Sequence, residues 1–559
     1  MTEKYWLKHY PPGIPAEIDP NTYSSLKDLL EQALPKYADN PAFVQMDRAM
    51  TYRELDDLSR GFAAWLQKSA GMKKGDRIAI MLPNVLQYPV AMLGAVRAGL
   101  TIVNVNPLYT PRELEHQLAD SGATAIVILE NFASVLQEVL PHTKVKRVLV
   151  TAVGDYLRWP KSWIVNYVVR HKRKQVPPWR IEGALDFRSV CIAGRSLKLD
   201  PVEVGHEDIA YLQYTGGTTG VAKGAVLTQF NMVANVLQAR AWFEGEGGLG
   251  EGSTYVIALP LYHIFSLTAN LWLFLSIGAR GILIVNPRDF TAFLRELQKY
   301  PPQFFMGVNT LFNALMNTPG FEKVDWSKLH GAVGGGMAVQ EAVAKKWKEM
   351  TGHVLSQGWG LTETSPVACM NPLKNDFNGS IGLPVSSTEI SIRDDDGHAL
   401  PQGQTGEICV RGPQVMRGYW NRPDETAKVM LPDGWLRTGD IGRMDEKGFV
   451  YIEDRKKDMI LVSGFNVYPN EVESVVVTHP GVLEAAAVAQ PDERSGEVVA
   501  VFVVKKDPNL TEKDVIDHTR KQLTGYKVPK RVYFKAELPK TNVGKILRRA
   551  LRDELPKAR

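Results

Sequence analysis

The 559-residue sequence is poor in cysteine, nearly balanced in charge and without a long apolar run. Its three cysteines, Cys191, Cys369 and Cys409, are far apart and lack metal-ligand spacing, so we expect packing residues in a reducing compartment. A net charge of +5 is small for this length and gives no support for nucleic acid as a partner. With 44% hydrophobic and 23% charged residues, the chain is predicted to be globular, with about two to four domains.

Neither a signal peptide nor a membrane-spanning helix is expected. Residues 1–20 carry charges and prolines but no apolar core. The stretch 266–284 is interrupted by Asn270, Arg280 and several small residues, short of the roughly 18–20 apolar residues that span a bilayer. We predict a buried helix, a turn and a strand there, and a cytoplasmic protein.

Strand and helix patterns alternate along the first part of the chain. A helix is predicted at 22–34, ended by Pro35; strands then follow at 76–82, 101–105 and 125–129, with helices at 88–98 and 112–120 between them. Short strands separated by turns follow at 386–450. The fold class predicted is α/β: a large N-terminal domain, 1–453, with two parallel-type α/β subdomains and a β subdomain at about 384–453, and a small α+β C-terminal domain, 454–559.

The most informative stretch is 214–224, Tyr-Thr-Gly-Gly-Thr-Thr-Gly-Val-Ala-Lys-Gly, which follows the apolar strand pattern 209–213. Glycines let backbone N–H groups approach an anion, threonines add donors and Lys223 adds charge, so the loop suits a polyphosphate. Because Gly224 follows Lys223, the loop is not the phosphate loop of common kinases and GTPases. A plain glycine-rich surface turn is the alternative.

Further candidates follow predicted strands. The triple glycine Gly334–Gly336 allows close approach of a flat ring or a phosphate, and His263 ends a strand where open sheets bind ligands. In the stretch 357–363, Trp359 between glycines offers a stacking face, and Glu363 could hold a divalent cation. Each also has an ordinary reading: a flexible turn, a structural histidine, a buried tryptophan.

The later candidates are weaker when taken singly. Asp440 follows a turn and could pair with ribose hydroxyls, although an aspartate more often caps its own turn. For the charged cluster 454–458, a solvated turn is the simplest prediction, and we place the domain boundary there. Lys545, after Gly544 in a basic tail, could be exposed and mobile or could simply begin a solvated helix.

The segment 157–180 breaks the α/β pattern. Aromatic residues such as Trp159 and Trp163 precede the basic block Arg170–Lys174. Rings at headgroup depth beside cationic side chains suit an anionic membrane surface. A helix packed on the domain with a solvated basic end is an equal alternative, and RNA binding is a distant third.

Together these motifs resemble, in their order along the chain, the ANL superfamily of adenylate-forming enzymes. The similarity covers nearly the whole sequence, and the stretches 104–118 and 454–472 most resemble bacterial long-chain-fatty-acid–CoA ligases. The resemblance implies ATP, CoA, a long-chain fatty acid and Mg²⁺. A carboxylate would attack ATP to give acyl-AMP and pyrophosphate, and a thiol would then displace AMP.

The resemblance also implies roles for individual residues. The catalytic residues would be Lys545, Glu363, Lys223 and Arg455, and the metal ligands Thr218 and Glu363. Asp440 would hold the ribose, and Arg455 a phosphate or ribose oxygen. The remaining nucleotide contacts would come from Thr215, Gly216, Gly217, Thr218, Thr219, Gly220, Gly334, Gly335, Gly336, Gln357, Gly358, Trp359, Gly360 and Thr362.

In such enzymes the small domain rotates between the two half-reactions, here about a hinge at Lys457. The rotation would withdraw Lys545 and bring Ser463, Gly464 and Phe465 toward CoA, with His263 on the substrate side. Trp359 departs from the tyrosine usual in the family, so it can stack but lacks the phenol.

Several alternatives remain open: a ligase for medium-chain, shorter or aromatic carboxylates, an acyl-AMP ligase that loads a carrier protein, a luciferase-type oxidoreductase, and a non-enzymatic sensor of acyl-adenylates or a membrane-recruited binding protein. A homodimer and peripheral binding to the inner face of the membrane also remain open.

Overall fold

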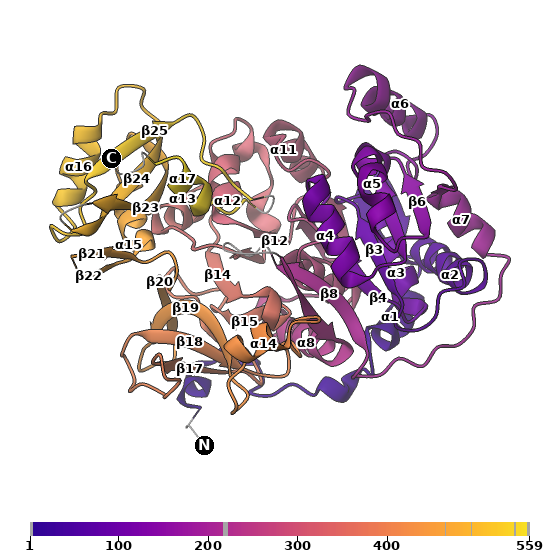
Figure 1. Ribbon diagram of the computed structural model, residues 1–559, viewed down its shortest axis with the longest axis horizontal. Coiled ribbons are helices and arrows are strands. Elements are labelled where there is room, and N and C mark those ends of the chain that lie inside the picture. The colour runs from indigo at the N-terminus through magenta and orange to yellow at the C-terminus, as the bar shows by residue number, and fades with distance from the viewer. Residues whose placement is uncertain (1–3, 216–221, 464, 493–494, 542–543, 556–559) are drawn as a thin grey trace.

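The computed structural model describes residues 4–215, 222–463, 465–492, 495–541 and 544–555. They form four β-sheets with helices packed around them (Figure 1). The alternation of strands and helices predicted from the sequence is confirmed, and the nine- and seven-stranded sheets are mainly parallel. Within the described residues, no helix is long and apolar enough to cross a membrane.

The seven-stranded sheet has the order β7-β6-β5-β3-β4-β8-β9, and only its last pair is antiparallel. Its strands are β3 (Arg77–Met81), β4 (Thr101–Asn104), β5 (Ala125–Leu129), β6 (Arg147–Thr151), β7 (Leu185–Asp186), β8 (Ile209–Thr215) and β9 (Lys223–Thr228). The neighbouring helices are α2 (Tyr52–Lys68), α3 (Gln87–Arg97), α4 (Pro111–Ser121), α5 (Ala133–Val139), α6 (Lys161–Tyr167) and α7 (Phe187–Gly194).

The nine-stranded sheet has the order β16-β15-β14-β13-β12-β10-β11-β1-β2. Its strands are β1 (Pro41–Gln45), β2 (Arg48–Thr51), β10 (Thr254–Ile257), β11 (Arg280–Leu283), β12 (Phe304–Gly307), β13 (Gly331–Gly334), β14 (Leu355–Gly360), β15 (Val367–Met370) and β16 (Leu383–Pro384). The helices of this part are α1 (Leu26–Lys36), α8 (Gln229–Gly247), α9 (Ile264–Ser266), α10 (Leu273–Leu275), α11 (Phe290–Lys299), α12 (Asn309–Met316) and α13 (Glu341–Thr351).

Helix α1 differs from its prediction at both ends. It starts at Leu26 because the Ser25 hydroxyl accepts the backbone N–H of Asp28 and caps the first turn. Residues 20–22 form a separate 3₁₀ turn instead. The helix also continues one residue past Pro35, because a proline in the last turn removes a single intrahelical hydrogen bond.

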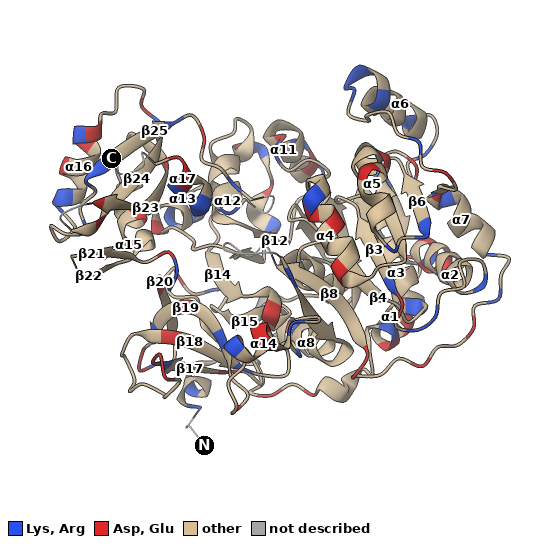
Figure 2. Cartoon of the chain, viewed as in Figure 1, with Lys and Arg blue, Asp and Glu red and all other residues tan. Residues whose placement is uncertain are grey.

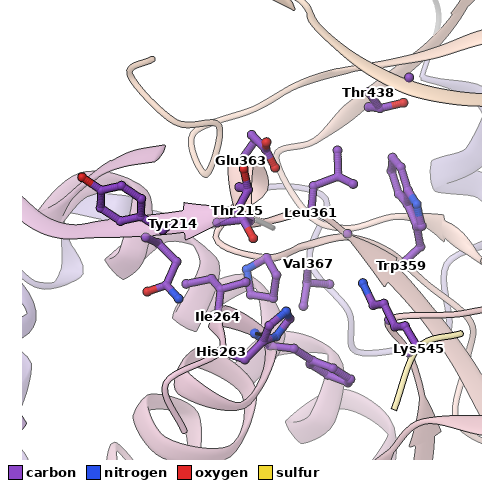
Figure 3. A pocket seen from close by; sticks show the side chains of 18 of the residues that line it. Tyr214, Thr215, His263, Ile264, Trp359, Leu361, Glu363, Val367, Thr438 and Lys545 are labelled. Carbon is purple, nitrogen blue, oxygen red and sulfur yellow. Dashed lines mark hydrogen bonds between the residues drawn. The ribbon is translucent and has the colours of Figure 1, made fainter. Parts of the chain in front are cut away.

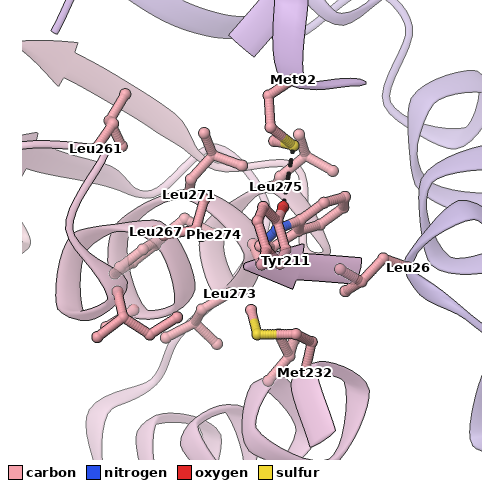
Figure 4. Packing of buried hydrophobic residues seen from close by; sticks show 14 of the residues in the cluster. Leu26, Met92, Tyr211, Met232, Leu261, Leu267, Leu271, Leu273, Phe274 and Leu275 are labelled. Carbon is pink, nitrogen blue, oxygen red and sulfur yellow. Dashed lines mark hydrogen bonds between the residues drawn. The ribbon is translucent and has the colours of Figure 1, made fainter. Parts of the chain in front are cut away.

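The two large sheets share one hydrophobic core (Figure 4). Residues 266–275, which contain a π-helical stretch at Leu267–Trp272, are buried in this core. The Trp272 indole N–H donates to the Tyr211 hydroxyl of β8 at 2.9 Å, and that hydroxyl donates to the Met92 sulfur at 3.3 Å. The prediction of a buried helix, turn and strand at 266–284 is therefore confirmed.

Two smaller sheets follow. The antiparallel sheet of the β subdomain contains β17 (Glu389–Arg393), β18 (Gly406–Arg411), β19 (Leu436–Met444) and β20 (Val450–Arg455), with α14 (Pro423–Val429) nearby. The last sheet contains β21 (Ile460–Val462), β22 (Phe465–Val467), β23 (Val482–Asp492), β24 (Gly496–Lys505) and β25 (Arg531–Lys535), with helices α15 (Pro469–Val476), α16 (Glu512–Arg520) and α17 (Arg548–Asp553). In Figure 1 this C-terminal unit is the yellow part at one end of the molecule.

Candidate active site

A cavity of about 1120 Å³ opens where the large sheets, the β subdomain and the C-terminal unit meet (Figure 3). We call it the central cavity. One part of its wall is polar and contains Lys223, Glu363, Arg455 and Lys545. Another part is apolar, with these residues: Ala239, Phe243, Ala269, Met306, Val333 and Met370. A single cavity thus has charged side chains that can bind phosphates and apolar side chains that can contact an alkyl chain.

The glycine-rich loop belongs to a β-hairpin. Strands β8 and β9 pair antiparallel with Thr215 opposite Lys223, and the Thr215 hydroxyl donates to the Lys223 carbonyl at 3.4 Å. Both residues line the cavity. The other predicted phosphate contacts, Gly216, Gly217, Thr218, Thr219 and Gly220, lie outside the described residues.

The Lys223 ammonium is held in place from two sides. Its Nζ lies 2.8 Å from a Glu425 carboxylate oxygen and 4.5 Å from the centre of the Tyr419 ring. The ion pair with Lys223 is the main reason that the pKa of Glu425 is lowered to about 2. The lysine is therefore pre-positioned at the end of the hairpin, with its charge balanced.

The ends of β13 and β14 form the next part of the wall. Gly335, Gly336, Gly358 and the segment 359–363 line the cavity. Gly336 has a φ of +74°, a backbone conformation that favours glycine, and a Cβ there would lie 3.2 Å from Cε of Lys545.

Two residues predicted to contact nucleotide lie behind this wall. The Gln357 side chain is buried, accepts the Val339 N–H at 2.6 Å and donates to the Ser380 carbonyl at 3.1 Å. A Cβ on Gly334 would lie 2.3 Å from a methyl of Val339. Both residues thus shape the strand ends from the protein side.

Trp359, Asp440 and Arg455 form one hydrogen-bonded group. The Trp359 indole N–H donates to one oxygen of Asp440 at 3.0 Å, and Nε of Arg455 lies 2.9 Å from the other. Asp440 is almost fully buried and lies opposite Arg455 in the β19–β20 pair. A carboxylate held from both sides has a defined orientation, and each oxygen keeps a further lone pair for a ligand hydroxyl. The indole thus makes a polar contact of its own in place of the missing phenol.

Lys545 reaches into the cavity from the C-terminal unit (Figure 3). The loop that carries it contacts the large domain, where the Thr310 hydroxyl donates to the Gly544 carbonyl at 3.2 Å. Burial, with the nearby Arg455 adding to it, lowers the pKa of Lys545 to about 8. The amine therefore titrates close to neutral pH and gains charge readily when an anion arrives.

His263 lines the same cavity and is the N-cap residue of α9. Its Nδ1 accepts the backbone N–H of Phe265 at 3.3 Å. Burial, and secondly the charge of Lys545, lower the pKa of His263 to about 3, so the ring is neutral at physiological pH. A neutral imidazole here is a hydrogen-bonding group and not a counter-ion.

Glu363, in a short 3₁₀ turn, presents a carboxylate to the cavity and suits a hard divalent cation such as Mg²⁺. One oxygen, Oε1, accepts the Tyr419 hydroxyl at 2.7 Å. Among the described residues, none donates a hydrogen bond to Oε2. The donor set at this position therefore fits the cation that the sequence predicted.

The structure keeps the predicted CoA-side loop away from this cavity. Ser463 and Phe465 lie at the β21–β22 turn of the C-terminal unit and are exposed, and Phe465 stacks on Tyr526 at 5.0 Å. Gly464 lies outside the described residues. Lys457, two residues after the end of β20, lines the cavity together with Arg455. One arrangement of the chain thus brings Lys545 into the cavity and leaves Ser463 and Phe465 outside it.

Sequence reasoning missed Tyr419 and Glu425. Tyr419 contacts both Glu363 and Lys223, whereas Glu425 contacts Lys223. Tyr419 and Glu425 are far along the chain from Lys223 and Glu363, so no rule of residue spacing predicts these contacts. The Gly-Tyr-Trp run at 418–420, within the region predicted to form short strands and turns, was the available signal.

Comparisons with known proteins agree with this geometry. The family model described as "AMP-binding enzyme" matches residues 30–420, and the one described as "AMP-binding enzyme C-terminal domain" matches 471–545. The chain is 56% identical over 554 residues to a long-chain-fatty-acid–CoA ligase of Escherichia coli O6:H1, covering 99% of this chain and 98% of that protein. It is 35% identical over 519 residues to 4-coumarate-CoA ligase 2 of Narcissus pseudonarcissus, covering 90% and 87%.

Solved structures show the same fold. Anthranilate CoA ligase AuaEII in complex with anthranoyl-AMP superposes with a TM-score of 0.84 at 26% identity, covering 96% of this chain and 98% of that one. ATP-bound MatB from Rhodopseudomonas palustris gives 0.80 at 27% identity, covering 94% and 98%. The resemblance inferred from the motifs is therefore confirmed, and the chain belongs to the AMP-binding enzyme family of adenylate-forming proteins.

Proposed function

We propose that this chain is a long-chain-fatty-acid–CoA ligase. It joins a fatty acid to AMP at the expense of ATP, releases pyrophosphate, and transfers the acyl group to CoA with release of AMP. The observation that carries the proposal is the central cavity, which is lined by charged side chains such as Lys545 and Glu363 and by apolar ones such as Phe243 and Met306. The near-complete coverage at 56% identity to a ligase with this substrate supports it.

In the first step, a fatty-acid carboxylate oxygen bonds to the α-phosphorus of ATP and the bond to pyrophosphate breaks. Lys545 neutralises negative charge on the carboxylate and the α-phosphate as they approach. Asp440 holds the ribose hydroxyls, and Arg455 a phosphate or ribose oxygen. Lys223 and the loop before it hold the outer phosphates.

The adenine lies against Trp359 and the glycines that end β13 and β14. Glu363 and Thr218 would hold Mg²⁺, which supplies charge neutralisation on the phosphates when bound. The neutral His263 is on the substrate side, next to the apolar wall.

In the second step, the CoA thiol sulfur bonds to the acyl carbonyl carbon and AMP leaves. Because Ser463 and Phe465 lie outside the cavity while Lys545 lies inside it, the two steps need different arrangements of the small domain. We propose that residues 1–453 and 454–559 are the two moving parts, with the hinge at Lys457.

A panel of carboxylic acids tests the function. Pyrophosphate release is measured with acetate, octanoate, laurate, palmitate and 4-coumarate, with and without CoA. We expect laurate and palmitate to be the best substrates, with acyl-CoA formed only when CoA is present. Preference for acetate or the aromatic acid would refute the chain-length assignment, and acyl transfer to a carrier protein but not to CoA would refute the thiol acceptor.

The segment 157–180 is proposed as a contact with an anionic membrane, which places the enzyme in the cytoplasm and at the inner face of the membrane. Helix α6 projects from the body of the molecule with basic residues at its end (Figure 2). Trp159 is 83% exposed and Trp163 63% exposed, and Lys172, Arg173 and Lys174 beyond them are exposed. Exposed aromatic rings beside cationic side chains have the chemistry of an interfacial anchor.

A further inference from the structure

The segment 416–420 lies between the glycine-rich hairpin and Glu363. It runs antiparallel to β9: the Val226 N–H donates to the Gly418 carbonyl at 2.9 Å, and the Trp420 N–H to the Gly224 carbonyl at 2.8 Å. At its other end, the Met416 N–H donates to the Glu363 carbonyl at 2.8 Å. Backbone hydrogen bonds therefore fix this segment to both sides of the site.

Tyr419, in the middle of the segment, contacts both functional side chains. Its hydroxyl donates to Oε1 of Glu363 at 2.7 Å, and its ring faces the Lys223 ammonium at 4.5 Å. Its own backbone N–H donates to the Thr426 hydroxyl at 2.8 Å, which anchors it to α14. One side chain thus sets the positions of the carboxylate and of the lysine.

The phenol hydroxyl has a charged acceptor, because it donates to Oε1 of Glu363 at 2.7 Å. A hydrogen bond from a neutral donor to a carboxylate is stronger than one between neutral groups.

We propose that Tyr419 is a positioning residue that couples metal binding to triphosphate binding. It holds one oxygen of Glu363 so that the other faces the cavity, and it keeps Lys223 beside the same space. A glutamate side chain loses rotamer freedom when it binds a cation, and a carboxylate that is already oriented loses less. The inference rests on the proposed function, because it assigns the β- and γ-phosphates and their cation to this corner of the cavity.

The test is equilibrium ligand binding by calorimetry, with no fatty acid present and therefore no turnover. Three ligands are compared: ATP with Mg²⁺, ATP with a chelator, and AMP, which lacks the outer phosphates. In Tyr419→Phe we expect about tenfold weaker binding of ATP with Mg²⁺, the scale for losing a hydrogen bond to a charged group. Affinities for AMP and for metal-free ATP should stay within about twofold, because the ring and its contact with Lys223 remain.

Tyr451→Phe is the matched control. The Tyr451 hydroxyl also donates to a carboxylate, that of Asp445, at 3.3 Å, but it lies outside the central cavity. This variant should bind all three ligands like the parent protein.

Two results would overturn the inference: unchanged binding of ATP with Mg²⁺ in Tyr419→Phe, or an equal loss for AMP, which would mean a general structural effect. Failure of the parent protein to bind ATP at all would instead refute the proposed function. The inference is supported if Mg²⁺ raises the affinity for ATP in the parent protein but not in Tyr419→Phe.

Discussion

Substitution of Trp359 by phenylalanine would test how the ribose site is oriented. The indole N–H donates to Asp440 at 3.0 Å, and Asp440 is only 2% exposed. Phenylalanine retains a ring for stacking on adenine but has no N–H, so one oxygen of a buried carboxylate loses its partner. A hydrogen bond to a charged group contributes about 1.5–3 kcal/mol, which corresponds to roughly 10–150-fold in affinity.

We expect the lower end of this range, about tenfold in kcat/KM for ATP, because Arg455 still holds the other oxygen of Asp440 at 2.9 Å. The loss should depend on the ribose hydroxyls that we propose Asp440 binds. The assay is pyrophosphate release at saturating palmitate, with ATP and 2′-deoxy-ATP compared in parent and variant. The penalty in Trp359→Phe should be clearly smaller with 2′-deoxy-ATP.

Trp326→Phe is the control, because the Trp326 N–H also has a buried acceptor, the Phe321 carbonyl at 3.2 Å, but Trp326 does not line the cavity. It should leave kcat/KM unchanged. Equal penalties for the two nucleotides in Trp359→Phe, or no penalty, would refute the reasoning that the indole orients the ribose carboxylate.

Three further predictions follow from the charged groups. Lys545→Ala should slow acyl-AMP formation about 10²-fold or more, whereas thioester formation from supplied acyl-AMP should survive; equal loss in both half-reactions would contradict the rotation of the small domain. The pKa of Lys545 is lowered to about 8 and the protonated amine is the form that neutralises negative charge, so kcat/KM for ATP should fall as pH rises through about 8. Lys545→Arg should abolish that fall. A parent protein whose kcat/KM stays constant up to about pH 9.5 would refute this role of the Lys545 charge. The fraction of protein that sediments with anionic vesicles should fall when salt is added, and should fall in a variant with Lys172, Arg173 and Lys174 changed to Gln. A control variant with Lys513, Lys521 and Lys530 changed to Gln should sediment like the parent protein. Equal weakening in both variants, or binding to RNA in place of vesicles, would reject the membrane contact.

Local patterns predicted the secondary structure well where burial and capping decide it. The Ser266–Ile284 stretch, for example, is buried as expected. The ends of α1 were harder to predict from the sequence, because several polar residues near Ser25 could equally have capped the helix.

The site was predictable only as separate motifs. Each glycine or charged residue can also be explained by an ordinary structural role. From the sequence, only the family resemblance assigned Lys223, Glu363 and Lys545 to one site, and the structure shows that all three line the same cavity. Neither the pairing of Thr215 with Lys223 nor the contacts of Tyr419 can be derived from spacing, since they depend on how distant strands align. The homodimer remains a prediction that a single chain does not test.

The strand order of the nine-stranded sheet has a consequence for biosynthesis. Strand β1 pairs with β11, with Phe43 opposite Gly281. This pair cannot form until the ribosome has synthesised roughly 240 further residues. At about 5–20 residues per second, a ribosome takes roughly 12–50 s to supply that partner. During this time the β1–β2 hairpin presents an apolar edge while the seven-stranded sheet is completed first. Newly made chains should therefore depend on chaperones most strongly before residue 281 emerges.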